Sequence, residues 1–210
     1  MRLFEIQKLN LLPLKSFKEL WHTGNFDSSK KKSESHEGSG LSVTTHPEEW
    51  KSITQLSGKT WTLSKKNNNF IDKHALSQNE KNNIVQWGID NKYIQYQSTY
   101  KVSWYDDDLD SEVSMEFGTK EEAIQEVGVD NIDDIREIKH GINMLPKLAK
   151  RTKNQITPSM SFDLLLTVYA EDHDYDGVWW EDNLDVARYS APRGVIVPTK
   201  LQTWNKHETF

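Results

Sequence analysis

Leu20-Trp21-His22-Thr23-Gly24 (LWHTG) combines an aliphatic–aromatic pair with a histidine and a small-residue turn. The residues from 18 to 22 predict a strand, and the glycine predicts the turn that ends it. A histidine at a strand end can present its ring to a ligand, because a neighbouring glycine leaves the backbone open to close approach. The alternative is a strand–turn–strand in which the histidine only faces solvent, and spacing alone leaves both interpretations open.

A second segment downstream carries small hydroxyl side chains into a helix start. Residues 25–40 are polar and predict a loop, whereas Leu41–Thr45 (LSVTT) predict a strand. His46-Pro47-Glu48-Glu49-Trp50 then predicts a helix, since proline is favoured in the first turn and acids near the positive helix end. The strand therefore offers hydroxyl donors of little bulk to a site near the histidine.

The C-terminal part of the chain contains a further strand with acids at its end. Residues 158–171 have apolar side chains at helical spacing, and Tyr175–Trp180 (YDGVWW) predicts an apolar strand after a tight turn. Glu181 and Asp182 follow directly, so we expect a carboxylate at the edge of a sheet, where it can hold a sugar hydroxyl or assist a nucleophile. A solvated acidic loop is the alternative. Residues 194–198 (GVIVP) predict one more buried strand.

The middle of the chain has a different pattern. Residues 92–105 and 111–117 alternate in the manner of strands on either side of an Asp-rich turn, which predicts a β-hairpin. Thr119-Lys120-Glu121-Glu122 predicts a capping box for a helix over residues 121–127. A second, acidic helix is predicted over residues 132–139.

The amino-acid composition limits the classes of protein to which this chain can belong. The chain has 210 residues, a net charge of -6 and 10% aromatic residues, which indicates a folded protein of one or two domains whose surface as a whole does not bind nucleic acid. It contains no Cys, which excludes disulfides and thiolate nucleophiles. The His residues form no metal-ligand motif, and no stretch reaches the length of a membrane span. We therefore expect a cytoplasmic protein that contacts neither metal nor membrane.

The segments quoted above together resemble the ADP-ribosyltransferase superfamily, in its diphtheria-toxin-like branch with small phage and polyvalent-protein relatives. The four places of the family pattern are filled in order by residues 20–24, 40–50, 175–180 and 194–201. The resemblance implies an α+β fold whose core is a split, mostly antiparallel pair of sheets with a cleft between them, formed by residues 1–63 and 158–210. Residues 64–157 are then an inserted β-hairpin and helical region, or an accessory lobe.

The resemblance also implies that NAD is the substrate that supplies ADP-ribose. His22 would hydrogen-bond a ribose hydroxyl, and the backbone of Thr23 and Gly24 would pair with the nicotinamide carboxamide. Small hydroxyl residues would line the cleft, and Arg193 would contact a phosphate of NAD or the target. The candidates for stacking on nicotinamide are Trp50, Trp61 and Phe70. The expected cofactor-binding set is His22, Thr23, Gly24, Ser42, Thr44, Thr45, Trp50 and Arg193.

The catalytic assignment depends on one carboxylate. Cleavage of the nicotinamide–ribose bond passes through an oxocarbenium-like sugar, which a single nearby negative charge stabilises. Glu181 is the first candidate, because it is the only glutamate close after its strand, and Asp182 and Asp185 follow. The family pattern places a glutamate at the opening of the final strand, where this chain has no acid in residues 190–194. Either an acid of the preceding strand takes over, or the chain lacks transferase activity.

The resulting hypothesis is a mono-ADP-ribosyltransferase that modifies a macromolecular target, a protein in preference to nucleic acid, with His22, Glu181 and Asp182 as catalytic residues. Such a protein fits a phage or bacterial effector acting in the cytoplasm, that of the host if it is phage-encoded. The first alternative is an inactive binding or inhibitor protein on the same fold, which occupies the basic surface of a partner with its acidic insert. An NAD glycohydrolase is the second, and a phosphotransferase acting on RNA ends ranks last.

Overall fold

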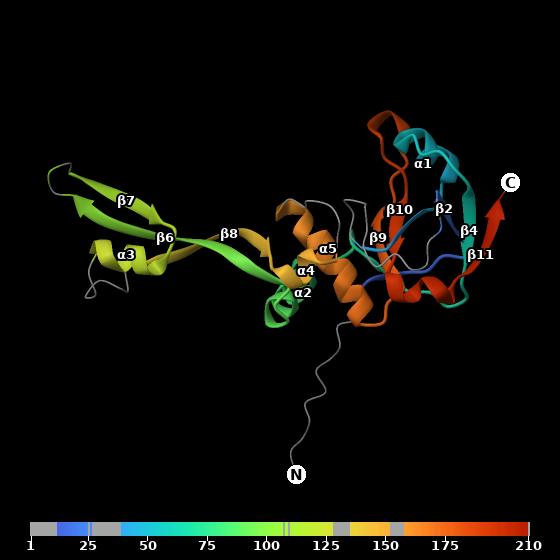
Figure 1. The fold of residues 1–210 in the computed structure, drawn as a ribbon. Helices are drawn as coiled ribbons and strands as arrows, with labels where there is room; N and C mark the ends of the chain where they lie inside the picture. Colours follow the sequence, from blue (N-terminus) through green and yellow to red (C-terminus); the bar gives the residue numbers. More distant parts are fainter. Residues whose placement is uncertain are drawn as a thin grey trace, which may run out of the picture.

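A curled sheet of eight strands forms the body of the protein, and a three-stranded sheet extends from it as an arm (Figure 1). The computed structural model describes residues 12–24, 26, 39–106, 108, 110–127, 135–151 and 158–209. Most of the loop predicted at residues 25–40 lies outside this set. The predicted α+β class is confirmed, and two sheets are present, but both ends of the chain lie in the eight-stranded sheet and the second sheet belongs to the arm.

The eight strands of the body interleave the two ends of the chain. All neighbouring strands are antiparallel except β5 and β9, which are parallel. The predicted strands from the two chain ends are therefore direct neighbours in the middle of the sheet. In spatial order the strands are β1 (Leu14–Lys15), β5 (Phe70–Asp72), β9 (Gly177–Glu181), β10 (Arg193–Ile196), β3 (Leu41–Thr44), β2 (Leu20–Thr23), β4 (Thr60–Ser64) and β11 (Asn205–Thr209).

Two hydrophobic clusters hold the body together, one on each face of the sheet. The helices α2 (Gln78–Asp90) and α5 (Pro158–Asp172) pack with one face, and they lie between the sheet and the arm (Figure 1). Leu164, Leu165 and Leu166 of α5 are all fully buried, which three consecutive residues of a helix achieve only when it is covered on several sides. The inside of the curl is filled by a second cluster, which includes Leu20, Leu41, Val43, Leu63, Phe70, Trp179 and Trp204.

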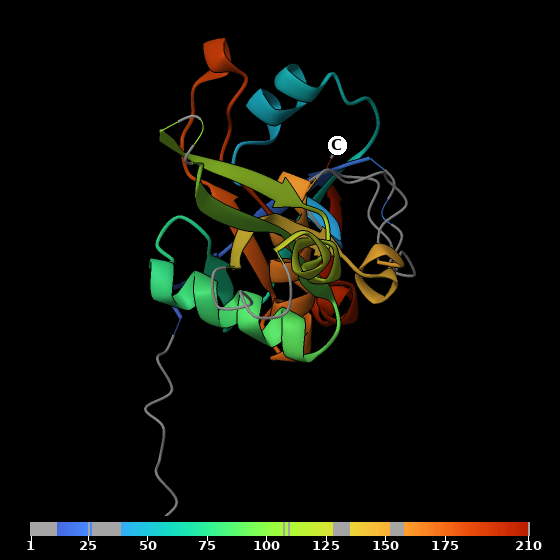
Figure 2. The ribbon, with the colours of Figure 1, turned by 90° about the vertical axis from the view of Figure 1, so that its left-hand side faces the viewer.

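The short helix α1 (Pro47–Thr54) follows β3, as predicted, with Pro47 in its first turn. Viewed along the arm, α1 and the connection between β9 and β10 rise next to each other from one end of the sheet, while α2 lies on the opposite side (Figure 2). The side chains of Arg193 and Trp50 join these two features, with the guanidinium carbon 5.6 Å from the indole centroid. The end of the sheet that carries the quoted motifs is thus framed by α1 and by residues 182–192.

The arm consists of β6 (Ile94–Asp106), β7 (Ser111–Phe117), β8 (Arg136–Met144) and α3 (Lys120–Val127). The predicted hairpin and capping box are both present. The Thr119 hydroxyl accepts the Glu122 N–H at 3.2 Å, and the Glu122 carboxylate accepts the Thr119 N–H at 3.1 Å. Across the range 94–144 there are thirteen acidic residues against four Lys and Arg, a net charge of -9. Since the whole chain carries -6, the remaining residues carry +3.

The helix predicted over residues 132–139 is wrong. Residues 136–144 form β8, which pairs with β6 over eight positions, and α4 (Pro146–Ala149) follows. Ile138 and Ile142 are four residues apart, a spacing that fits a helix as well as a strand. The local pattern therefore does not distinguish between the two structures. Strand β6 has thirteen residues, and its second edge would lack hydrogen-bond partners without β8, so the tertiary pairing overrides the local preference.

The range assigned to the insertion contains parts of the body. Strand β5 lies between β1 and β9 in the large sheet, and Ile84 of α2 belongs to the same hydrophobic cluster as α5. Residues 94–144 alone form the arm. Among the described residues, no helix is both long and apolar enough to cross a membrane.

Gly177 opens β9 where β5 and β10 approach it most closely. A Cβ at this residue would lie 1.9 Å from the Val195 carbonyl oxygen and 2.7 Å from the Phe70 ring. We expect Gly177→Ala to lower the free energy of unfolding by about 3 kcal/mol, because backbone has to move. Urea denaturation measures this. Gly141→Ala, in β8 with nothing within 4 Å of the added carbon, is the control and should change stability by less than about 0.5 kcal/mol. If both variants lost the same free energy of unfolding, the close approach of β5 and β10 to Gly177 would not be the cause.

Candidate functional site

Strands β2 and β3 part from each other directly after Trp21. Strand β2 pairs with β4 at four positions, from Leu20 to Thr23, but with β3 only where Trp21 lies opposite Thr44. His22 and Thr23 therefore have no pairing partner on β3, although both strands continue in sequence. A local opening of this kind leaves backbone groups in the middle of a sheet without their ladder bonds.

The imidazole of His22 spans this opening. Its Nδ1 lies 2.8 Å from the Ser42 carbonyl oxygen, which can only accept, so Nδ1 donates this hydrogen bond. Ser42 lies two residues from Thr44, so its carbonyl is directed towards β2 like that of Thr44. The ring thus takes the bond that the β2 backbone would make in a closed sheet. Gly24, with φ +119°, leaves space beside Nε2, because a Cβ there would lie 3.8 Å from that atom.

The backbone groups of Gly24 are used within the body. Its N–H donates to the Lys59 carbonyl at 2.8 Å, and its carbonyl accepts from the Trp61 indole at 3.0 Å. Because backbone groups alternate in direction along a strand, those of Gly24 and His22 point to β4, and those of Thr23 point towards β3. The backbone N–H and C=O that point into the opening are therefore those of Thr23. The sequence predicted that the backbone of both Thr23 and Gly24 would bind a ligand, but in the structure only that of Thr23 points into the opening.

The residues predicted to bind a cofactor divide between the two faces of the sheet. Arg193, Thr44 and Trp21 are register partners across three strands, so their side chains share one face, together with α1 and Trp50. His22 points to the other face, where it lies opposite Trp61 with Phe26 nearby. Of the three aromatic candidates for stacking, Trp61 is the one on the His22 face and accessible. Phe70 is fully buried.

The predicted hydroxyl residues have structural partners. The Thr44 hydroxyl donates to the Pro192 carbonyl at 2.5 Å and accepts the His46 N–H at 3.0 Å, so it fixes the start of β10 to the start of α1. The Thr45 hydroxyl is 3.0 Å from Nδ1 of His46. Ser42 contributes its carbonyl to His22. The hydroxyls of Thr44 and Thr45 are thus used in contacts within the body.

The predicted acids lie at the end of β9, with β10 and β3 between them and β2. Glu181 is the register partner of Arg193, and its Oε1 accepts the N–H groups of Asp182 and Asn183 at 2.9 and 2.8 Å. Its Oε2 makes no hydrogen bond to the described residues. Asp182 is held by an ion pair with Lys15 and by the Trp179 indole N–H at 2.7 Å. Asp185, the third candidate, caps the turn Val186–Arg188.

Partial burial acts to raise the pKa of the Asp182 carboxyl, but the hydrogen bonds from Lys15 and Trp179 outweigh it and hold that pKa below its ordinary value. Lys15 also pairs with Asp72 at 3.1 Å, so it bridges β1, β5 and the residue after β9. Asp182 thereby fixes the end of β9, whereas Glu181 keeps one oxygen for another partner.

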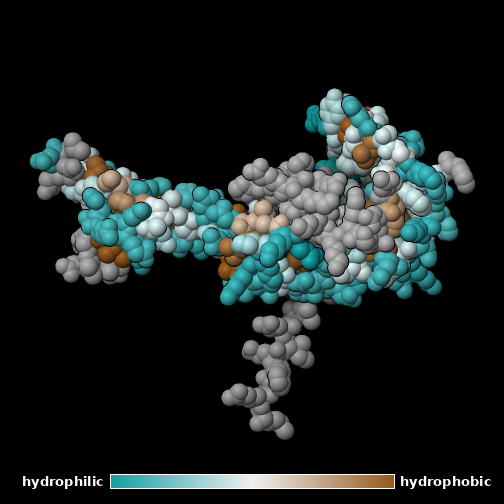
Figure 3. Space-filling view, in the orientation of Figure 1, coloured by the Kyte–Doolittle hydropathy of each residue, from teal (hydrophilic) through white to brown (hydrophobic). Residues whose placement is uncertain are grey.

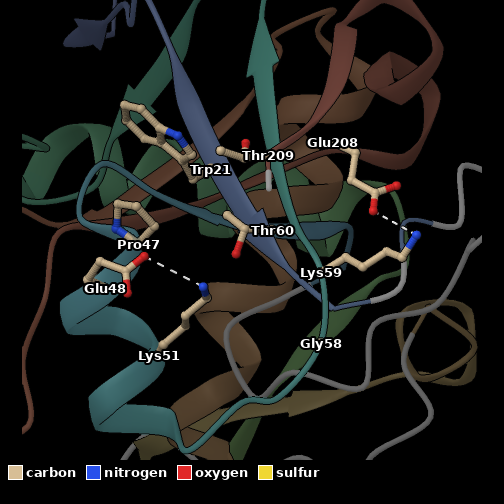
Figure 4. Close-up of a pocket in the computed structure, with 9 residues that line it drawn as sticks. All are labelled: Trp21, Pro47, Glu48, Lys51, Gly58, Lys59, Thr60, Glu208 and Thr209. Atoms are coloured by element: carbon tan, nitrogen blue, oxygen red, sulfur yellow. Dashed lines mark ion pairs between the residues drawn. The ribbon is translucent and has the colours of Figure 1, made fainter.

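A hollow of about 450 Å³ lies beside the opening, between α1 and the ends of β4 and β11 (Figure 4). Trp21 forms one wall, and two ion pairs flank it, Glu48 with Lys51 and Lys59 with Glu208. Thr60 lines the hollow, and its hydroxyl is buried with no hydrogen-bond partner among the described residues, as is that of Thr23, its register partner. Buried hydroxyls without partners are costly, which makes this pair a candidate contact for a polar ligand.

Sequence reasoning did not find Lys51, Lys59 and Thr60, because the hollow exists only through the register of β2 against β4 and the position of α1. No protein-family model, no curated protein and no solved structure matches this chain. Within the parts of the chain that the structure describes, no group of three or more His, Cys, Asp or Glu residues could hold a metal ion.

The contact of Asp182 with Lys15 predicts a pH-dependent stability. The folded-state pKa is below the unfolded value of about 3.9, so this stabilisation is present above pH 4 and is lost as the pH falls through the folded-state pKa. We expect Asp182→Asn to be about 1 kcal/mol less stable than the original protein at pH 7, a modest value because the side chain is 56% exposed.

The difference should shrink as the pH falls through the folded-state pKa, which urea denaturation over a series of acidic pH values measures. Glu112→Gln, on the exposed surface of the arm, is the control and should show no difference at any pH. A destabilisation by Asp182→Asn that stays the same over the whole series would show that the ion pair is not its cause.

Proposed function

We propose that this protein binds NAD and transfers its ADP-ribose unit to a macromolecular target, as a mono-ADP-ribosyltransferase. The observation that carries the proposal is the opening between β2 and β3, with the Thr23 backbone at its edge and His22 across it. A primary carboxamide offers an N–H donor and a carbonyl acceptor side by side, as a peptide group does. The nicotinamide carboxamide can therefore take the place that the β3 backbone leaves vacant.

The arrangement of the motif segments gives independent support. The four segments that resemble the ADP-ribosyltransferase superfamily supply β2, β3, β10 and β9, which are consecutive neighbours in the sheet. Segments more than 120 residues apart in the chain thus lie side by side in one sheet, as a shared site would require.

The chemistry assigned to each residue follows from its contacts. With Nδ1 bound to Ser42, Nε2 of His22 accepts a hydrogen bond from a ribose hydroxyl and orients the sugar. The bond between C1′ and the nicotinamide nitrogen breaks, and its electron pair leaves with nicotinamide. Glu181 remains the first candidate for the negative charge that stabilises the oxocarbenium-like sugar, although strands β10 and β3 lie between it and His22. The target's nucleophile then attacks C1′ and releases its proton.

A second candidate function is a binding protein without catalysis. The observation that favours it is Arg193, which stands at the opening of the final strand, where the family pattern has a glutamate, and which packs on Trp50. The charge of -9 on the range 94–144 would then meet a basic partner protein. An NAD glycohydrolase is a third outcome, which shares the cleavage step and lacks the transfer step.

The carboxamide slot predicts a selective response to small ligands. Nicotinamide should raise the melting temperature, and nicotinic acid should bind at least tenfold more weakly. Nicotinic acid lacks an N–H donor, and its carboxylate meets the Thr23 carbonyl. Thermal shift and calorimetric titration measure both. Equal binding of the two compounds, or binding of neither, would argue against a slot that reads an amide.

The transferase assignment predicts loss of label transfer in two variants. With NAD labelled in the adenylate part and a cell lysate as the source of targets, His22→Ala and Glu181→Gln should each reduce transfer about a hundredfold. Glu112→Gln, an exposed acid on the arm away from the opening, is the matched control and should leave transfer unchanged. Free ADP-ribose without transfer would identify a glycohydrolase. If NAD remained intact after incubation, both enzymatic functions would be excluded, and the binding protein would be the remaining candidate.

A further inference from the structure

A second hollow, of about 530 Å³, lies at the other end of the same strands. It is formed by the link between β1 and β2, the turn between β4 and β5, and the first residue of β11. Ser64 lies four residues along β4 from Thr60, so the hollow is about 13 Å from the opening at Thr23, at roughly 3.3 Å per residue. It is therefore separate from the site described above.

The floor of this hollow is rigid because of Asn68. The side chain is only 2% exposed, and its amide is saturated by the backbone. Its oxygen accepts the Phe17 N–H at 2.8 Å, and its nitrogen donates to the carbonyls of Phe17 and Lys65, both at 2.7 Å. These bonds lock the turn after β4 onto the segment before β2. The polar groups around the hollow are thus held in place before any ligand arrives.

The lining of the hollow is rich in donors and contains no carboxylate. Three lysines surround it, together with Ser, Asn and one Phe side chain. Lys65 is anchored by Asp176, with 2.5 Å between Nζ and Oδ1. Lys18 and Lys66 are exposed and make no ion pair with the described residues. In an acidic protein, a concave site with two lysines lacking counter-ions favours an anionic ligand.

We propose that this hollow binds the phosphate of a nucleotide, either free or within a nucleic-acid strand. Lysine ammonium groups, amide N–H groups and serine hydroxyls are the donors that proteins use for phosphate oxygens. The volume lies within the range of pockets for small ligands, 300 to about 1,000 Å³, and suits a mononucleotide unit. Outside the acidic range 94–144 the chain carries a net charge of +3, so the rest of the sequence does not oppose an anionic ligand.

The test uses the full chain without NAD, so its result is independent of the proposed transferase. The probes are fluorescein-labelled 12-nucleotide single strands of DNA and RNA, read by anisotropy, and ATP and inorganic phosphate as competitors. We expect Lys18→Glu with Lys66→Glu to weaken binding at least tenfold. For a strand, the slope of log K against log salt should fall by about 1.4, at 0.7 per phosphate contact.

The control is Lys120→Glu with Lys150→Glu, two exposed lysines away from the hollow with the same total change of charge. It should bind like the original protein. Circular dichroism and melting temperature establish that both variants are folded. Strand binding that depends on Lys18 and Lys66 supports the nucleic-acid source, and ATP binding alone with the same dependence supports a free nucleotide. Binding of no probe, equal affinity of all three proteins, or equal loss in both variants overturns the proposal.

Discussion

The candidate site of this protein depends on the separation of β2 from β3 after a single pair of residues. In a closed antiparallel sheet, the Ser42 carbonyl would accept the Thr23 N–H, and the opening would not exist. The His22 ring occupies that carbonyl instead. A hydrogen bond of this kind contributes about 1 kcal/mol net, so the balance between the open and closed arrangements is set by few contacts. The Thr44 hydroxyl, bound to Pro192 and His46, fixes β3 just before the strands part.

The same opening separates the roles of neighbouring residues. Gly24 is committed to β4 through both of its backbone groups, and it contributes space beside the histidine. Thr23 keeps its backbone directed into the opening. At the end of β9, Asp182 serves the architecture through Lys15 and Trp179, whereas Glu181 retains an oxygen without a partner among the described residues. Adjacent residues of one motif thus differ in role: some are held by contacts within the body, and others direct polar groups into the opening.

Charge is distributed unevenly over the molecule. The acidic arm projects from the body, its surface is largely hydrophilic, and its base adjoins α5 (Figure 3). The rest of the chain is net positive and carries both hollows. The body and the arm therefore carry net charges of opposite sign. The net charge of the whole chain conceals this division, which appears only when the arm is considered separately.

The sequence by itself determined the features that depend on neighbours in the chain. The strands around His22 and Trp179, the proline at the start of α1 and the Thr119 capping box follow from local pattern and local hydrogen bonding. Only the tertiary structure shows that residues 136–144 form a strand and that β5 belongs to the body. In both cases the strand forms by pairing with a segment that is distant in the sequence, β6 for β8 and β9 for β5. The register of β2 against β3 and β4 is not encoded in any local pattern. It directs the Thr23 backbone towards the opening, and it brings Lys18 close to Lys65 and Lys66 around one hollow.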